Sequence, residues 1–139
     1  AGQAVKIIFQ CALTLTAAAS TIAYACVPNL PAGGRQIESA RYVLAYRARP
    51  SPIAVSRHFA LEFALCAKDG TIMPDTVRVD AHMPEHRHGM NYKVSVKPEA
   101  GGRYRAEGLL FHMPGRWELI FELRAAGQTD RLTYSEVIE

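Results

Sequence analysis

The stretch HFALEFALCA, residues 58–67, decides the fold class, because its large apolar residues recur at every second position. A period of two is typical of a β-strand that buries one face, since successive side chains of a strand point to opposite sides. One predicted face carries the large residues Phe59, Leu61, Phe63 and Leu65. The other face carries Ala60, Glu62, Ala64 and Cys66. The stretch therefore predicts a strand with its larger side chains in a core.

The same alternation continues on both sides of this strand. It is found in YVLAYR, TVRVDAH, YKVSV, YRAEGLLF, WELIFEL and RLTYSEVI, at residues 42–47, 76–82, 92–96, 104–111, 117–123 and 131–138. Turns that contain glycine, such as KDGT and PEAGG, separate several of these runs. About seven short strands in roughly 100 residues predict an all-β fold, a two-sheet antiparallel β-sandwich whose regular structure begins near Ala40.

The N-terminal segment differs in kind from the rest of the chain. Residues 4–25, AVKIIFQCALTLTAAASTIAYA, hold one charge, at Lys6, and end in the small-x-small pattern Ala23-Tyr24-Ala25. This pattern predicts a signal peptide over residues 1–25. The alternative is an uncleaved membrane-anchor helix, because the segment is nearly long enough to span a bilayer. Both alternatives place the remaining chain in the periplasm or another extracytoplasmic compartment, where the anchor would tether it to a membrane.

The segment after the leader is expected to be irregular. Residues 26–39 include two prolines and a glycine pair, which predict a linker before a sandwich domain at 40–139. Cys26, at the start of this linker, has two possible fates. It could carry a lipid at a mature N-terminus, or it could pair with Cys66 in an oxidising compartment. Cys66 could equally be a small buried apolar residue in its strand.

Charge and residue spacing exclude two classes of function. The formal net charge of +3, from 16 basic and 13 acidic residues, is too small and too scattered to indicate a nucleic-acid partner. No nucleophile and base, and no pair of carboxylates, have a spacing that indicates catalysis. We therefore expect a protein that is not an enzyme.

Residues that bind soft metals gather in one part of the sequence. HMPEHRHGM, residues 82–90, contains three histidines and two methionines, and HMP returns at residues 112–114. A site that mixes thioether sulfur and imidazole nitrogen favours copper, Cu(I) in particular, whereas zinc prefers cysteine, histidine and carboxylate. If residues 86–90 were extended, His86, His88 and Met90 would project to the same side.

The two HMP stretches would meet if the strands at 77–82 and 104–111 ended at one rim of the sandwich. The sequence does not establish this topology. The alternative is a set of solvent-exposed histidines on a loop, with Met83 and Met113 filling the core. Trp117 is expected to be a core anchor.

These motifs resemble the YtkA-like domain family, which is related to the FixH-like proteins. The family pattern has a Met-Pro-x-His-x-His-Gly loop, a Gly-x-Tyr strand and a Phe-x-Met-x-Gly-x-Trp stretch. The matching residues here are Met83, Pro84, His86, His88, Gly89 and Met90, then Gly102 and Tyr104, then Phe111, Met113, Pro114, Gly115 and Trp117. The resemblance covers about residues 55–138.

The resemblance implies an immunoglobulin-like sandwich outside the cytoplasm, and for some relatives a role in copper handling or in assembly of copper-containing oxidases. It supports Met83, His86, His88, Met90 and Met113 as copper ligands, while His82 and His112 lie beside the motif. The sequence thus predicts a periplasmic or membrane-tethered copper-binding protein for copper delivery, storage or buffering, with a copper-acceptor protein as a possible partner. The alternative is a non-catalytic accessory subunit or assembly factor of a membrane complex, with the His/Met loop as a structural contact.

Overall fold

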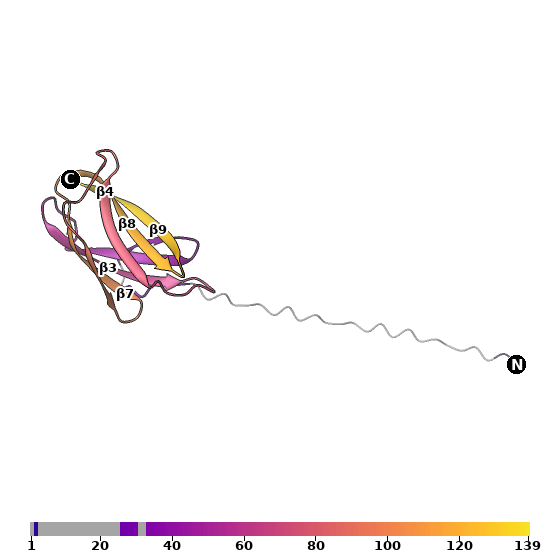
Figure 1. The fold of residues 1–139 in the computed structure, drawn as a ribbon. Coiled ribbons are helices and arrows are strands. Elements are labelled where there is room, and N and C mark those ends of the chain that lie inside the picture. Colours follow the sequence, from indigo (N-terminus) through magenta and orange to yellow (C-terminus); the bar gives the residue numbers. More distant parts are fainter. Residues whose placement is uncertain (1, 3–25, 31–32) are drawn as a thin grey trace.

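The computed structural model describes residue 2 and residues 26–30 and 33–139, whose regular structure consists of nine β-strands (Figure 1). Apart from Gly2, the predicted signal or anchor segment at 1–25 lies outside the described residues. Within the described residues, no helix is long and apolar enough to span a bilayer.

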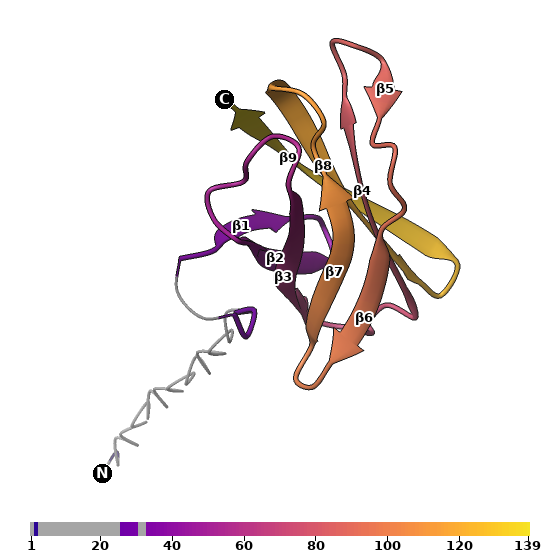
Figure 2. The same ribbon diagram turned by 90° about the vertical axis from the view of Figure 1, so that its left-hand side faces the viewer.

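The strands form two antiparallel sheets that face each other (Figure 2). The first sheet has the order β1 (Arg35–Glu38), β2 (Tyr42–Arg49), β3 (His58–Ala67), β7 (Arg103–Leu110) and β6 (Ser95–Glu99). The second has the order β5 (His88–Gly89), β4 (Thr76–Met83), β8 (Gly115–Ala125) and β9 (Gln128–Ile138). The predicted all-β antiparallel sandwich is confirmed.

The core lies between the two sheets and follows the predicted alternation. Residues Phe59, Leu61, Phe63 and Leu65 of β3 are at most 4% exposed. They face the inner residues of β8, and the rings of Phe63 and Phe121 lie 5.3 Å apart, centroid to centroid. Burying such side chains contributes about 1.5–3 kcal/mol each relative to leaving them exposed. These two strands therefore provide much of the free energy that holds the sheets together.

Two short strands were not predicted. β1 lies inside the segment expected to be an irregular linker, and β5 lies inside the His/Met loop. Both are edge strands held by backbone pairing to a single neighbour, β2 or β4. Because RQIE in β1 has one apolar residue and HG in β5 has none, neither carries an alternating pattern. The prediction of irregular structure for all of residues 26–39 was therefore wrong at Arg35–Glu38.

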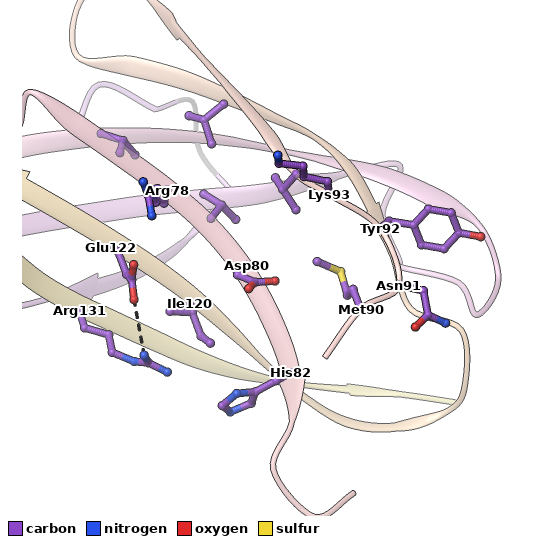
Figure 3. Close-up of a pocket in the computed structure, with 14 residues that line it drawn as sticks. Arg78, Asp80, His82, Met90, Asn91, Tyr92, Lys93, Ile120, Glu122 and Arg131 are labelled. Carbon is purple, nitrogen blue, oxygen red and sulfur yellow. Dashed lines mark ion pairs between the residues drawn. The ribbon is translucent and has the colours of Figure 1, made fainter. Parts of the chain in front are cut away.

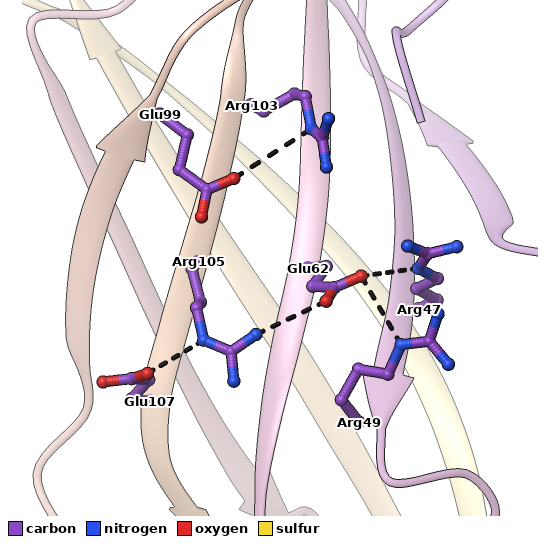
Figure 4. Close-up of polar contacts among 7 residues, drawn as sticks. All are labelled: Arg47, Arg49, Glu62, Glu99, Arg103, Arg105 and Glu107. Carbon is purple, nitrogen blue, oxygen red and sulfur yellow. Dashed lines mark hydrogen bonds and ion pairs between the residues drawn. The ribbon is translucent and has the colours of Figure 1, made fainter. Parts of the chain in front are cut away.

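The outer face of the first sheet carries a row of paired charges (Figure 4). Cross-strand register places Glu62 of β3 between Arg47 of β2 and Arg105 of β7. Arg47 Nε donates a hydrogen bond of 2.6 Å to Glu62, and Arg105 lies 3.4 Å from its other oxygen. The hydrogen bond from Arg47 holds the pKa of the Glu62 carboxyl below its ordinary value. The charged side chains of this row are therefore paired with one another.

A disulfide joins Cys26 to Cys66, with the two Cα atoms 5.6 Å apart. Of the two alternatives for Cys26, the structure contains the disulfide. A sulfur atom in a disulfide cannot also hold a thioether-linked lipid. Cys66 is at the end of β3 that approaches the β6–β7 hairpin, and Asn29 lies against Gly101 of that hairpin. The disulfide therefore fixes residues 26–30 at this end of the sandwich.

Candidate metal centre

The turn between β4 and β5 carries two of the predicted ligands. The Met83 carbonyl accepts hydrogen bonds from the backbone N–H groups of His86 (3.2 Å) and Arg87 (2.9 Å). Arg87 has a φ of 56°, so the chain reverses there and does not run extended. The condition of an extended segment over 86–90 is not met, because the Met83 carbonyl closes a tight turn. The turn nevertheless brings the rings of His86 and His88 within 5.7 Å, centroid to centroid.

The pleat of β4 separates the two neighbouring residues His82 and Met83. Met83 pairs with His88 of β5, and His82 pairs with Glu118 of β8. Directly paired residues share a face, so Met83 and His88 lie on the inner side of the sheet. His82 lies on the outer side, where its Nε2 is 3.2 Å from Glu118 Oε1.

The second HMP stretch meets the first at one end of the sandwich. His112 and Met113 lie in the connection between β7 and β8, and the ring of His112 lies 5.1 Å from that of His88. Trp117 Nε1 donates a hydrogen bond of 3.0 Å to the Met113 carbonyl. Both HMP stretches therefore contribute to one rim, the first from the end of β4 and the second from the connection between β7 and β8.

Gly115 allows Met83 to reach this rim. A Cβ atom at Gly115 would lie 2.7 Å from the Met83 methyl group, and the φ of Gly115 is +127°. Both conditions exclude a larger residue without local rearrangement. Met83 itself is 1% exposed. We call His86, His88, His112, Met83 and Met113 the rim cluster.

The hydrogen bonds of the rim histidines leave nitrogen atoms free to bind a metal. His88 Nδ1 lies 3.2 Å from the Gly89 carbonyl. A carbonyl can only accept, so this contact places the proton on Nδ1 and leaves the lone pair of Nε2 unused. His112 Nδ1 is buried and has no hydrogen-bond partner among the described residues. A buried polar atom without a partner is rare in folded proteins and is what a bound metal ion would satisfy.

The spacing of the rings fits ligation of one ion by neighbouring histidines. A metal–nitrogen bond of about 2.0 Å puts an imidazole centroid roughly 3 Å from the ion, so two rings on one ion have centroids within roughly 6 Å. The 5.1 Å between His88 and His112 and the 5.7 Å between His86 and His88 meet this limit. The described residues hold no group of three His, Cys, Asp or Glu arranged for a metal. A complete ligand set at the rim would thus include methionine sulfur.

The other two predicted ligands, His82 and Met90, line a hollow of about 950 Å³ along the edge of β4 (Figure 3). Val77 and Val79 contribute to its apolar part. Its charged residues are Arg78, Asp80, Lys93, Glu122 and Arg131. Of the seven predicted ligands, the structure brings together the rings of His86, His88 and His112, places Met83 in the core and Met113 against it, and places His82 and Met90 beside a different feature.

Trp117 was expected to be a core anchor, and it is fully buried. It also borders the rim cluster, because its ring lies 5.3 Å from that of His112 and 5.9 Å from that of His88. Sequence reasoning missed this second role. The available signal was the short spacing from His112 to Trp117 across the tight turn at Pro114 and Gly115.

A family model described as YtkA-like matches residues 35–122, more than half of the chain. The chain belongs to the YtkA-like family. The match spans β1 to most of β8 and includes all five residues of the rim cluster. The YtkA-like domain thus begins earlier than residue 55, where the motif resemblance began.

Comparison with known proteins adds one structural relative to the YtkA-like domain. The crystal structure of a DUF4426 family protein from Pseudomonas aeruginosa PAO1 has a TM-score of 0.53 at 10% sequence identity. The similarity covers 76% of this chain and 94% of that chain, and it shows a shared fold. No curated protein matches the chain.

Proposed function

We propose that this YtkA-like domain binds one copper ion, preferentially Cu(I), at the rim cluster and holds it outside the cytoplasm for delivery, storage or buffering. The observation that carries the proposal is the buried His112 Nδ1 without a partner, in a ring 5.1 Å from that of His88. A buried imidazole nitrogen next to a second imidazole with a free Nε2 is a ready pair of ligands for one ion.

The chemistry of the rim cluster favours copper over harder metals. Its five side chains offer neutral imidazole nitrogen and thioether sulfur, the ligand types that suit copper and especially Cu(I). The nearby carboxylate of Glu85 lies 3.1 Å from Arg116 Nε, in an ion pair. Neutral ligands leave the charge of the ion uncompensated, and a monovalent ion then has a smaller desolvation cost than a divalent one.

The differing exposure of the ligands supports reversible binding. His86 is exposed, His88 is half-buried and Met83 is buried. An incoming ligand from an acceptor protein could replace His86 first while the inner residues still hold the ion. The Cys26–Cys66 disulfide supports an extracytoplasmic location, because such bonds persist in oxidising compartments.

A competition titration tests the proposal. Cu(I) is added anaerobically to the purified protein in the presence of a chromophoric Cu(I) chelator, and bound metal is counted. We expect one Cu(I) per chain, and a loss of affinity of about tenfold or more in His88→Ala and in His112→Ala.

Two matched variants separate the rim from the rest of the surface. His58→Ala removes a histidine that contacts Leu109 O and Tyr92 instead of the rim cluster. His82→Ala removes the histidine that faces Glu118. Both should bind Cu(I) like the unmodified protein. Weak binding of equal strength in all five proteins would contradict the proposal and favour the accessory-subunit alternative, with the His/Met loop as a structural contact.

A further inference from the structure

Trp117 has an unusual position for a core residue. It is the one tryptophan of the sequence and is fully buried on the inner face of β8. Its ring stacks on Phe111 with centroids 4.6 Å apart and an interplanar angle of 12°. The rings of His88 and His112 approach it at steep angles of 68° and 82°. The indole therefore forms a wall between the apolar core and the two central histidines of the rim cluster.

The free nitrogen of His112 indicates on which side of the histidines an ion would lie. Because His112 Nδ1 is buried, an ion bound to it lies on the protein side of the imidazole ring and not in open solvent. The centroids of both imidazoles are within 6 Å of the indole centroid. An ion bound roughly 3 Å from either imidazole centroid, on the side that faces the indole, comes within the distance of about 6 Å at which cation–π attraction acts.

From this geometry we infer that Trp117 contacts the bound ion through its π-system and is the residue that makes the site select Cu(I) over Cu(II). The inference rests on the proposed function. An indole wall supplies soft electron density but no lone pair, and it keeps water out. Cu(II) prefers a tetragonal set of nitrogen and oxygen ligands, which this wall does not provide, whereas Cu(I) accepts few, soft ligands.

The indole N–H is engaged elsewhere and supports this arrangement. Trp117 Nε1 donates to the Met113 carbonyl at 3.0 Å, which fixes the orientation of the ring. The same bond holds the backbone that carries His112 and Met113. Trp117 is thus both a contact for the ion and a positioning residue for two of its ligands.

The experiment follows Trp117 directly during an anaerobic Cu(I) titration of the unmodified protein. With one tryptophan in the chain, the indole N–H signal in a ¹H–¹⁵N spectrum and the tryptophan emission both report this residue. We expect the N–H signal to shift and the emission to fall, each reaching its limit at one equivalent of Cu(I). Trp117→Phe should bind Cu(I) about tenfold more weakly, and its affinity for Cu(II) should fall less than its affinity for Cu(I).

The outcomes distinguish this inference from the function on which it rests. Binding of one Cu(I) that depends on His88 and His112, with an unmoved indole signal, would overturn the role of Trp117 and leave the copper site standing. Failure to bind Cu(I) would overturn both. If Trp117→Phe does not fold, titrating the unmodified protein with Cu(II) as well as Cu(I) still decides the question, because an indole signal that responds equally to both ions would overturn the selective role of Trp117.

Discussion

The imidazole rings of His88 and His112 lie 5.1 Å apart, although one belongs to β5 of the second sheet and the other follows β7 of the first. The pair joins residues that are far apart in the sequence and that meet only in the folded protein. A ligand that binds both histidines therefore binds the folded protein in preference to the unfolded chain.

Cu(I) should accordingly stabilise the protein against heat. At a free concentration of 100 times Kd, ligand binding adds about 2.7 kcal/mol to the free energy of unfolding, which corresponds to roughly 10 °C in Tm for a domain of this size. Anaerobic differential scanning calorimetry measures the shift. His112→Ala should lose most of it, while His58→Ala should keep it. A shift of equal size in both variants would contradict binding at the rim.

Replacing methionine sulfur should weaken Cu(I) binding with little effect on the fold. In Met113→Leu the side-chain volume is nearly conserved, so the free energy of unfolding should fall by less than about 1.5 kcal/mol. The Cu(I) affinity should fall by about tenfold or more, because the soft ligand is lost while Cu(II) binding relies on imidazole. Competition titrations with each oxidation state measure both effects. The control is Met73→Leu, at an exposed position.

Gly115→Ala should disturb both the backbone and Met83. Alanine at a φ of +127° destabilises the fold by about 1–3 kcal/mol, and its Cβ would displace the Met83 methyl group. We expect lower stability in a denaturant titration together with weaker Cu(I) binding. Gly127→Ala is the matched control, because Gly127 has a φ of +75° and nothing within 4 Å of an added Cβ. It should lose stability and keep its Cu(I) affinity.

Loss of the disulfide should lower stability without affecting the rim. The bond joins residues separated by 40 positions, and closing a loop of that length stabilises a protein by about 4 kcal/mol in the chain-entropy model. Cys66→Ser should reduce the free energy of unfolding by up to this amount in a urea titration. Because Cys66 and His58 are at opposite ends of β3, and His58 pairs with Leu110 next to the rim, Cu(I) affinity should not change. A large drop in affinity would show that the two ends are coupled.

Stability should also depend on the ionisation of Glu62. Arg47 lowers the pKa of Glu62 in the folded protein, so the unfolded chain binds a proton there more readily. The stabilisation is fully present above the ordinary glutamate pKa of about 4.3 and is lost as the pH falls through the lowered folded value. Glu62→Gln should therefore be less stable than the unmodified protein at neutral pH, and the difference should shrink in acid.

Thermal unfolding of both proteins between neutral and acidic pH tests this dependence. Glu122→Gln serves as the control, because Glu122 has a longer contact of 3.6 Å with Arg131 on the other sheet. Its stability should differ little from that of the unmodified protein, as is usual for exposed ion pairs. If the difference in stability between Glu62→Gln and the unmodified protein stayed constant with pH, the role of the Glu62 charge would be contradicted.

The sequence predicted the strands whose apolar residues alternate, such as β3 and β8, because burial of one face imposes that pattern. It did not predict β1, since an edge strand held by backbone bonds needs no apolar face. The turn at 84–87 was also missed, because the Met83 carbonyl that closes it belongs to the backbone and leaves no mark in residue type.

The candidate site was predicted in composition but not in arrangement. His82 and Met83 are neighbours in the sequence, yet the pleat of β4 sends them to opposite faces. His112 lies beside the family motif, and in the structure its ring is 5.1 Å from that of His88. Contacts between residues so far apart in the sequence are not visible in local spacing.

The disulfide attaches the N-terminal segment to the end of the sandwich opposite the rim cluster. The chain enters the sandwich at Cys26, which is fastened to the far end of β3, some eight residues or roughly 26 Å from His58 and the histidine rim. Figure 2 shows the β6–β7 hairpin and β5 at opposite extremes of the fold. A surface that held this protein by its leading segment would have the rim cluster pointing away from it. Under the proposed function, an acceptor protein could then reach the rim cluster from the side opposite that surface.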